Sequence, residues 1–263
     1  MLRRLLRRLS PSPPNPSPPP LPADWRGFDR DTLHHFDAPE LPLQPHGMAV
    51  PSYALRTEAG TGDLAMFLGI GEAWAQMVAR FLPDEPVVLD LGCGCGKLAR
   101  FLHLNPRLRY VGVDIFLPGI LWCRRAFAGS ADRFRFEHFD GYSATYNPDG
   151  RIAVTDYSLP AADASVDVVV CSSLFTHLLE ADAIHYLGEI ARVLKPGGQA
   201  FISVHNAVAP GERWRGDEER IDLDEDYFLE LCAMSGLIAE EPIGEVYGQV
   251  VHRLRNSVAS RGR

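Results

Sequence analysis

The fold is decided by the stretch Val87-Val88-Leu89-Asp90-Leu91-Gly92-Cys93-Gly94-Cys95-Gly96-Lys97-Leu98. An apolar run that is unbroken up to Asp90 is typical of a parallel strand covered on both faces. Glycines at alternate positions then predict a sharp turn at which the backbone comes close to a ligand. A helix from about Gly96 to Leu104 would point its free N–H groups into that turn. We therefore expect a strand, a ligand-binding turn and a helix start.

The spacing of the glycines indicates which ligand the turn holds. A dinucleotide fingerprint reads G-x-G-x-x-G, whereas here the glycines stand at 92, 94 and 96, after the acid Asp90. An acid would repel a pyrophosphate and favours a ligand with a cationic end, such as the α-amino group of an amino acid. The stretch Val88–Gly96 resembles the first motif of the class I S-adenosylmethionine-dependent methyltransferases. The resemblance implies that Asp90, Gly92, Gly94 and Gly96 bind the cofactor.

A second acid follows one strand–helix–strand unit later. Leu108–Asp114 is predicted to be a short strand that ends at Asp114, beside the first turn. A carboxylate at this place can accept both hydroxyls of a ribose, in NAD sites as in S-adenosylmethionine sites. Asp114 therefore predicts a nucleoside without deciding between the two, and Ile115 is expected to cover one face of the adenine. A solvated acid at a strand end is the alternative.

A further acceptor and a further donor of hydrogen bonds to the adenine are implied by the family resemblance. In methyltransferases that resemble the stretch around Asp156-Tyr157-Ser158-Leu159-Pro160, the acid before Leu-Pro accepts hydrogen bonds from the adenine N6, and the next residue offers its backbone N–H. These roles map onto Asp156 and Tyr157. Helix Leu117–Ala128 and strand Phe134–Phe139 are expected before this stretch. A polar insertion over 142–152 is also expected there.

The fourth predicted strand ends at Cys171-Ser172, where ligands bind at the carboxyl edge of a parallel sheet. Ser172 is therefore assigned to the cofactor site. His177 follows in the same loop and has an ordinary pKa of about 6.5, which suits removal of a proton from a hydroxyl. A histidine before a helix can also serve only to order the loop. His177 is thus either the catalytic base or a structural residue.

Later motifs extend the resemblance. Ala191–Gly198, which ends a predicted helix over 180–194, is one of the family's more specific marks. Tyr146-Asn147-Pro148-x-Gly150, together with Ser173–Leu178, resembles bacterial methyltransferases that are associated with glycan and secondary-metabolite genes. The resemblance covers roughly residues 63–254. It implies an α/β fold with a doubly wound, seven-stranded, mostly parallel sheet, the Rossmann-like methyltransferase fold.

Composition narrows the class of protein. The chain has 263 residues, of which 46% are hydrophobic and 23% charged, and its formal net charge is −8. A nucleic-acid binder usually has a basic face, so we expect no nucleic-acid partner. No apolar run approaches the ~20 residues of a membrane-spanning helix. Five scattered cysteines without paired spacing predict reduced thiols and a cytoplasmic location, with no metal site, although an ion shared with a substrate stays open.

The order of segments predicts four regions. Residues 1–22 hold four arginines and a proline-rich run, which predicts a disordered basic tail, or a weak contact with a membrane or an acidic partner. Residues 23–82 are expected to wrap the domain and cap the cofactor, with a helix over 63–82 that breaks near Gly69-Ile70-Gly71. The cofactor domain spans 83–254 and a frayed tail spans 255–263. Ala207–Asp222 is predicted to be a loop, with Arg213-Trp214-Arg215 either closing over a substrate or anchoring the loop.

These observations predict an enzyme of the EC 2.1.1 type that uses S-adenosylmethionine. The expected reaction is O-methylation of a small molecule or of a sugar or glycan hydroxyl by in-line transfer, because a positioned acceptor needs little further help. The alternatives are a non-catalytic or regulatory S-adenosylmethionine-binding protein and, against the glycine spacing, a nicotinamide-dependent oxidoreductase. The sequence leaves the oligomeric state and the identity of the acceptor undecided.

Overall fold

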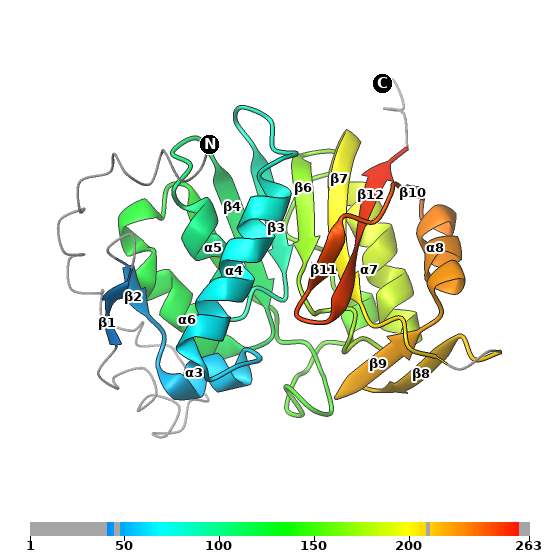
Figure 1. Ribbon diagram of the computed structural model, residues 1–263, viewed down its shortest axis with the longest axis horizontal. Coiled ribbons are helices and arrows are strands. Elements are labelled where there is room, and N and C mark those ends of the chain that lie inside the picture. The colour runs from blue at the N-terminus through cyan, green and yellow to red at the C-terminus, as the bar shows by residue number, and fades with distance from the viewer. Residues whose placement is uncertain (1–40, 45–47, 209–210, 258–263) are drawn as a thin grey trace.

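A central sheet lies between two layers of helices (Figure 1). The computed structural model describes residues 41–44, 48–208 and 211–257. The predicted tail over 1–22 lies outside the described residues. So do residues 23–40 of the cap segment and 258–263 of the terminal tail. The division of the chain into four regions therefore stays a prediction.

The main path of the sheet has seven strands, as the sequence predicts. Five consecutive strands of this path are parallel, and β12 (Gln249–Asn256) is antiparallel to its two neighbours on the path. A short strand, β11 (Gly244–Val246), pairs with β12 beside this path. The order across the sheet is β10 (Leu237–Ala239), β12 (Gln249–Asn256), β7 (Leu194–Val204), β6 (Val166–Cys171), β3 (Val87–Leu91), β4 (Arg109–Asp114) and β5 (Phe134–His138).

Each face of the sheet has its own apolar core, because successive side chains of a strand point to opposite faces. Val88 and Val168 belong to one core, and their neighbours Leu89 and Val169 belong to the other. In Figure 1, α4 lies in front of the sheet and α7 lies behind it. The first core is covered by α4 (Leu64–Val78), α5 (Lys97–Leu102) and α6 (Leu117–Ala126), and the second by α7 (Glu180–Val193) and α8 (Glu225–Met234).

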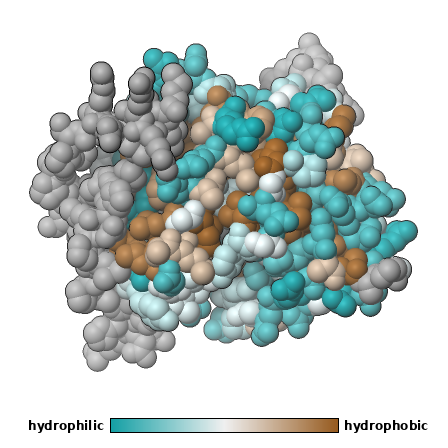
Figure 2. Space-filling view, in the orientation of Figure 1, coloured by the Kyte–Doolittle hydropathy of each residue, from teal (hydrophilic) through white to brown (hydrophobic). Residues whose placement is uncertain are grey.

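Helix α4 runs without a break through Gly69 and Gly71, so the predicted interruption is wrong. The reason for Gly71 is packing. A Cβ atom there would lie 2.3 Å from the backbone oxygen of Lys97, so glycine allows α4 to approach the start of α5. Figure 2 shows apolar residues gathered over α4 and neighbouring elements in the middle of this face. Among the described residues, no helix is long and apolar enough to cross a membrane.

The segment before α4 is held by buried arginines. It contains β1 (Leu41–Gln44), β2 (Met48–Val50) and α3 (Tyr53–Glu58), and β1 pairs with β2. The Arg56 guanidinium donates to the backbone oxygens of Pro51 and Gly62, and Arg100 of α5 donates to the backbone oxygens of β2. The Arg56 hydrogen bonds hold the segment together, and those of Arg100 join it to α5, the helix that follows the glycine turn.

Two predictions near the C-terminal half need correction. Part of the expected loop over 207–222 is a hairpin of β8 (Trp214–Asp217) and β9 (Arg220–Leu223), anchored by the N–H of Ile221, which donates to the oxygen of Thr176 at 2.8 Å. The frayed tail does not begin at 255, since β12 continues to Asn256. The Asn256 amide donates to the oxygen of Leu194 at 2.8 Å, which explains the longer strand.

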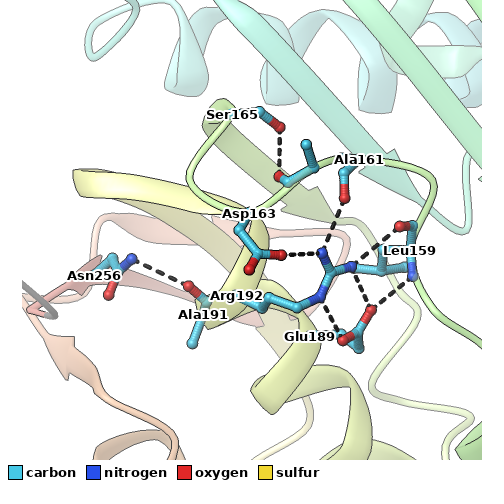
Figure 3. Close-up of polar contacts among 9 residues, drawn as sticks. Leu159, Ala161, Asp163, Ser165, Glu189, Ala191, Arg192 and Asn256 are labelled. Carbon is cyan, nitrogen blue, oxygen red and sulfur yellow. Dashed lines mark hydrogen bonds and ion pairs between the residues drawn. The ribbon is translucent and has the colours of Figure 1, made fainter. Parts of the chain in front are cut away.

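The turn that contains Leu159 is pinned to α7 by one arginine (Figure 3). Arg192 donates to the backbone oxygens of Leu159 and Ala161 and to the carboxylates of Asp163 and Glu189. Glu189 in turn accepts from the N–H of Leu159 at 2.7 Å. This network fixes the segment that leads into β6. Two short 3₁₀ turns complete the described elements: η1 (Ala128–Ser130) lies before β5, and η2 (Val154–Asp156) lies before β6.

Candidate functional site

Two adjoining cavities lie at the carboxyl ends of the parallel strands, where ligands bind in open α/β sheets. The larger measures about 230 Å³ and the smaller about 80 Å³. Six residues line both cavities, which makes them one continuous site. These are Gly92, Asp114, Ile115, Tyr146, Leu174 and His177. The structure thus brings together Gly92, Asp114, Ile115 and His177, as the sequence predicts.

The glycine turn supplies one wall of the larger cavity. Gly92 has a φ of +74° and Gly94 a φ of +54°, values that side chains other than glycine rarely adopt. Both residues line the cavity, so their backbone faces the ligand space. Gly96 lines neither cavity. A Cβ atom at Gly96 would lie 3.1 Å from the sulfur of Cys123, so this glycine serves packing behind the turn.

Asp114 connects the end of β4 to this turn. Its Oδ2 accepts from the N–H of Gly94 at 2.6 Å, and its Oδ1 accepts from the N–H of Phe116 at 2.7 Å. Burial raises the pKa of Asp114, while these two hydrogen bonds act in the opposite direction. The free lone pairs of an ionised carboxylate held in this way can still accept hydrogen bonds from hydroxyls.

Asp90 was assigned to the cofactor, but its side chain is buried beneath the turn. It lies inside β3, is only 2% exposed and lines neither cavity. The Tyr110 hydroxyl donates to Asp90 Oδ2 at 2.5 Å, and Oδ1 has no hydrogen-bond partner among the described residues. Burial raises the pKa of Asp90 to about 7. Asp90 therefore supports the turn from within the core and does not contact the ligand space.

Asp156 and Tyr157 also stand outside the two cavities. Asp156 is exposed at the end of η2, and the Tyr157 ring stacks on Phe139 with 3.7 Å between ring centroids. This stretch follows the insertion over 141–152. The insertion closes on itself through a bridge between Gly141 and Ile152 and separates β5 from this stretch. Sequence reasoning missed Phe139, which lines the smaller cavity directly after β5.

His177 lines both cavities and contacts two other segments of the chain. Its Nδ1 lies 2.9 Å from the Tyr146 hydroxyl and 2.9 Å from the backbone oxygen of Glu218, at the tip of the β8–β9 hairpin. Burial lowers the pKa of His177, so the imidazole is neutral at pH 7. Glu218 was not predicted, because only the folded hairpin brings it here. No local pattern in the sequence predicts the contact between His177 and Glu218.

The loop after β6 holds a strained residue. Ser173 has a φ of +61° and lines the larger cavity beside the predicted Ser172. The Gln249 amide of β12 donates to Ser173 Oγ at 2.8 Å, and the buried Ser203 hydroxyl accepts from the Ser173 N–H at 2.8 Å. Such strain persists only where neighbours determine the conformation. Gln249 and Ser203 therefore set the course of the loop that carries His177.

The charge of the lining is acidic. Glu58, Asp114, Asp182 and Glu218 line the site, and Lys97 is the only lysine or arginine among the described lining residues. Lys97 Nζ donates to the backbone oxygen of Ala59 at 2.8 Å, and burial lowers its pKa. Within the described part of the chain, no cluster of three or more His, Cys, Asp and Glu side chains could hold a metal ion.

Comparison with known proteins agrees with this geometry. Residues 89–202 match the family described as "Methyltransferase domain". A tRNA (carboxymethyluridine(34)-5-O)-methyltransferase from Arabidopsis thaliana is 27% identical over 191 residues, 70% of this chain but only 37% of that protein. A probable S-adenosylmethionine-dependent methyltransferase from Mycolicibacterium smegmatis is 27% identical over 203 residues, 76% of this chain and 70% of that protein.

Solved structures give the same fold. The 1,6-didemethyltoxoflavin-N1-methyltransferase of Burkholderia thailandensis, solved with S-adenosylhomocysteine, superposes with a TM-score of 0.52. It is 22% identical, and the likeness covers 74% of this chain and 80% of that one. The sequence match, the sheet order and the glycine turn agree. The chain therefore carries a class I S-adenosylmethionine-dependent methyltransferase domain, with S-adenosylmethionine as its cofactor.

Proposed function

We propose that the protein transfers a methyl group to a hydroxyl oxygen of a small molecule or of a sugar or glycan, with His177 as the base. The observation that carries this proposal is the place of His177. It lines both cavities together with Gly92 and Asp114. His177 would thus accept a proton beside the proposed seat of the methyl donor, where methylation of an oxygen needs a base.

The residues around the cavities fit the cofactor. The backbone of Gly92 and Gly94 would receive the amino-acid end, Asp114 the ribose hydroxyls and Ile115 one face of the adenine. Phe139, in place of Asp156 and Tyr157, would line the adenine end in the smaller cavity. S-adenosylmethionine supplies an activated methyl group on a sulfonium. What remains for the protein is to position the acceptor and to remove its proton.

The lining also suggests the class of acceptor. Trp74, Tyr146 and Tyr247 line the larger cavity, and aromatic faces suit the ring of a sugar or a phenol. Glu58 lines the same cavity and would repel an anion, as would Asp182 and Glu218 from the adjoining smaller cavity. These features support a neutral acceptor. They count against the alternative of an anionic substrate closed in by Arg213 and Arg215, which do not line either cavity.

A tRNA acceptor is the second candidate, and the name of the Arabidopsis relative favours it. The acidic lining opposes it, because most of the affinity for nucleic acid comes from lysines and arginines that contact phosphates.

All five cysteines are free and buried, which supports a reducing compartment such as the cytoplasm. The acceptor atom itself is proposed to be oxygen.

The test supplies methyl-labelled S-adenosylmethionine to the full-length protein together with catechol, methyl glucopyranoside or unfractionated tRNA. We expect label in a small acceptor and none in tRNA, with transfer lost in His177→Gln. Label in tRNA alone would overturn the choice of acceptor. Tight binding of S-adenosylhomocysteine without transfer to any of the three would favour a regulatory protein, and a stabilising shift with NADH alone would favour an oxidoreductase.

A further inference from the structure

Three segments that are distant in the sequence meet at one nitrogen atom. His177 follows β6, Tyr146 belongs to the 141–152 insertion, and Glu218 lies at the tip of the β8–β9 hairpin. The Tyr146 hydroxyl and the Glu218 backbone oxygen both lie 2.9 Å from His177 Nδ1. The tyrosine and imidazole rings meet edge to face, with centroids 5.2 Å apart and planes at 76°.

The chemistry of these partners fixes the position of one proton. A backbone carbonyl can only accept, so the contact with Glu218 requires a hydrogen on Nδ1 of the neutral imidazole. The lone pair of the ring then stands on Nε2. Since Nδ1 already carries a hydrogen, the Tyr146 hydroxyl can meet it only as an acceptor. The proton of that hydroxyl is therefore free to be donated to another group.

The backbone around Tyr146 is fixed by the tip of the β8–β9 hairpin. Its N–H donates to Ser143 Oγ at 3.0 Å, and the Ser143 hydroxyl donates to a carboxylate oxygen of Glu218 at 2.5 Å. The same oxygen accepts from the Thr145 N–H at 3.0 Å. The hairpin tip thus clamps the insertion with its side chain while its backbone contacts His177. Burial and the nearby charges of Glu219 and Glu218 raise the pKa of Tyr146, which keeps the hydroxyl protonated at neutral pH.

We propose that Tyr146 binds the acceptor by donating its hydroxyl proton to a second oxygen, next to the oxygen that His177 deprotonates. Tyr146 lines both cavities, so its hydroxyl can donate a hydrogen bond to a ligand bound there. The acceptor is then a molecule with two neighbouring oxygens, such as a vicinal diol of a sugar or a catechol. This inference rests on the proposed function, because it assumes an acceptor oxygen beside His177.

The first test measures the tautomer without any acceptor. ¹⁵N-labelled histidine in the full chain, saturated with S-adenosylhomocysteine, reports which nitrogen of His177 carries the hydrogen. We expect Nδ1–H in the wild type and in Tyr146→Phe, and a mixture in Glu218→Ala, where the clamp is lost. An Nε2–H tautomer in the wild type, or a switch caused by Tyr146→Phe, would overturn the proposal, since Tyr146 would then donate to His177.

The second test measures the acceptor preference with catechol and phenol as probes. Loss of one hydrogen bond changes affinity by about tenfold, so we expect transfer to catechol to exceed transfer to phenol by about that factor. Tyr146→Phe should abolish the preference and leave the affinity for S-adenosylhomocysteine within twofold. Tyr53→Phe, an exposed tyrosine outside both cavities, is the matched control.

The outcomes separate this inference from the proposed function. Equal transfer to both probes, no transfer to either, or a preference that survives in Tyr146→Phe would overturn the role of Tyr146. A tenfold loss of affinity for S-adenosylhomocysteine in Tyr146→Phe would place the hydroxyl on the cofactor and overturn it as well. Full transfer in His177→Gln would instead show that His177 is not the base. The catechol preference and its dependence on Tyr146 would be unaffected by that result.

Discussion

The carboxylate of Asp114 accepts a hydrogen bond of 2.6 Å from the backbone N–H of Gly94, and this contact ties the end of β4 to the glycine turn after β3. The two strands are neighbours in the parallel sheet. Because both residues line the larger cavity, one acid shapes the turn and faces the ligand at the same time. The cofactor site therefore depends on Asp114 in two ways.

Replacing Asp114 should weaken the binding of the cofactor more than replacing any other single acidic residue. A charge-assisted hydrogen bond contributes about 1.5–3 kcal/mol, which corresponds to roughly a 10- to 100-fold change in affinity. We expect a loss of this size for S-adenosylhomocysteine in Asp114→Ala, measured by calorimetric titration. Asp156→Ala is the matched control, because Asp156 is exposed and outside both cavities. An equal loss of affinity in Asp156→Ala would show that the adenine contacts Asp156.

Two glycines of α4 should respond in opposite directions to alanine. A Cβ atom at Gly71 would collide with the oxygen of Lys97, whereas at Gly69 it would meet nothing within 4 Å. We expect Gly71→Ala to lower the free energy of unfolding by about 1–3 kcal/mol and Gly69→Ala to raise it by roughly 0.4–1 kcal/mol. Urea denaturation measures both. Equal effects would contradict the close approach of α4 to α5.

Asp90 should make the stability of the protein depend on pH. Burial raises its pKa to about 7, so between about pH 4 and pH 7 the folded state keeps a proton that the unfolded chain has released. Its contribution to the free energy of unfolding therefore falls as the pH rises through this window. We expect the difference between wild type and Asp90→Asn to change in that window and to level off above it. A flat difference would mean that Asp90 is ionised in the folded protein.

The rate of methyl transfer should follow the titration of His177. Burial lowers the pKa of His177 below its ordinary 6.5, and only the neutral ring accepts a proton. We expect kcat to rise with pH through an apparent pKa below 6.5 and to be flat above pH 7. General base catalysis contributes about 10²- to 10⁴-fold, which is the loss expected in His177→Gln. An unchanged profile in that variant would leave His177 only a structural role.

Local sequence patterns predicted the strands, the turn and the carboxyl-edge residues well. Gly92, Asp114, Ile115, Ser172 and His177 all line the site, because parallel strands bring their carboxyl ends to one edge. The doubly wound sheet was predicted from the family resemblance and agrees with the observed strand order. Asp90, Gly96, Asp156 and Tyr157, which were also assigned to the cofactor, line neither cavity, so the sequence predicted only part of this end of the site.

The rest of the site could not be predicted in the same way. Asp156 was assigned to the adenine through the family resemblance, but it lies outside both cavities, and Phe139 lines the smaller one. The hairpin tip at Glu218 reaches His177 across 41 residues of sequence through a backbone oxygen, which no residue type announces. Contacts of this kind depend on tertiary packing and not on local propensity.

The central claim is that the glycine turn, Asp114 and His177 surround one methyl-donor site. A crystal structure of the chain with S-adenosylhomocysteine tests it most directly. We predict ribose hydroxyls on the Asp114 carboxylate, the amino-acid end against Gly92 and Gly94, and the sulfur facing the part of the cavity that His177 lines. A nucleoside bound away from Asp114, or a sulfur on the side remote from His177, would contradict the account.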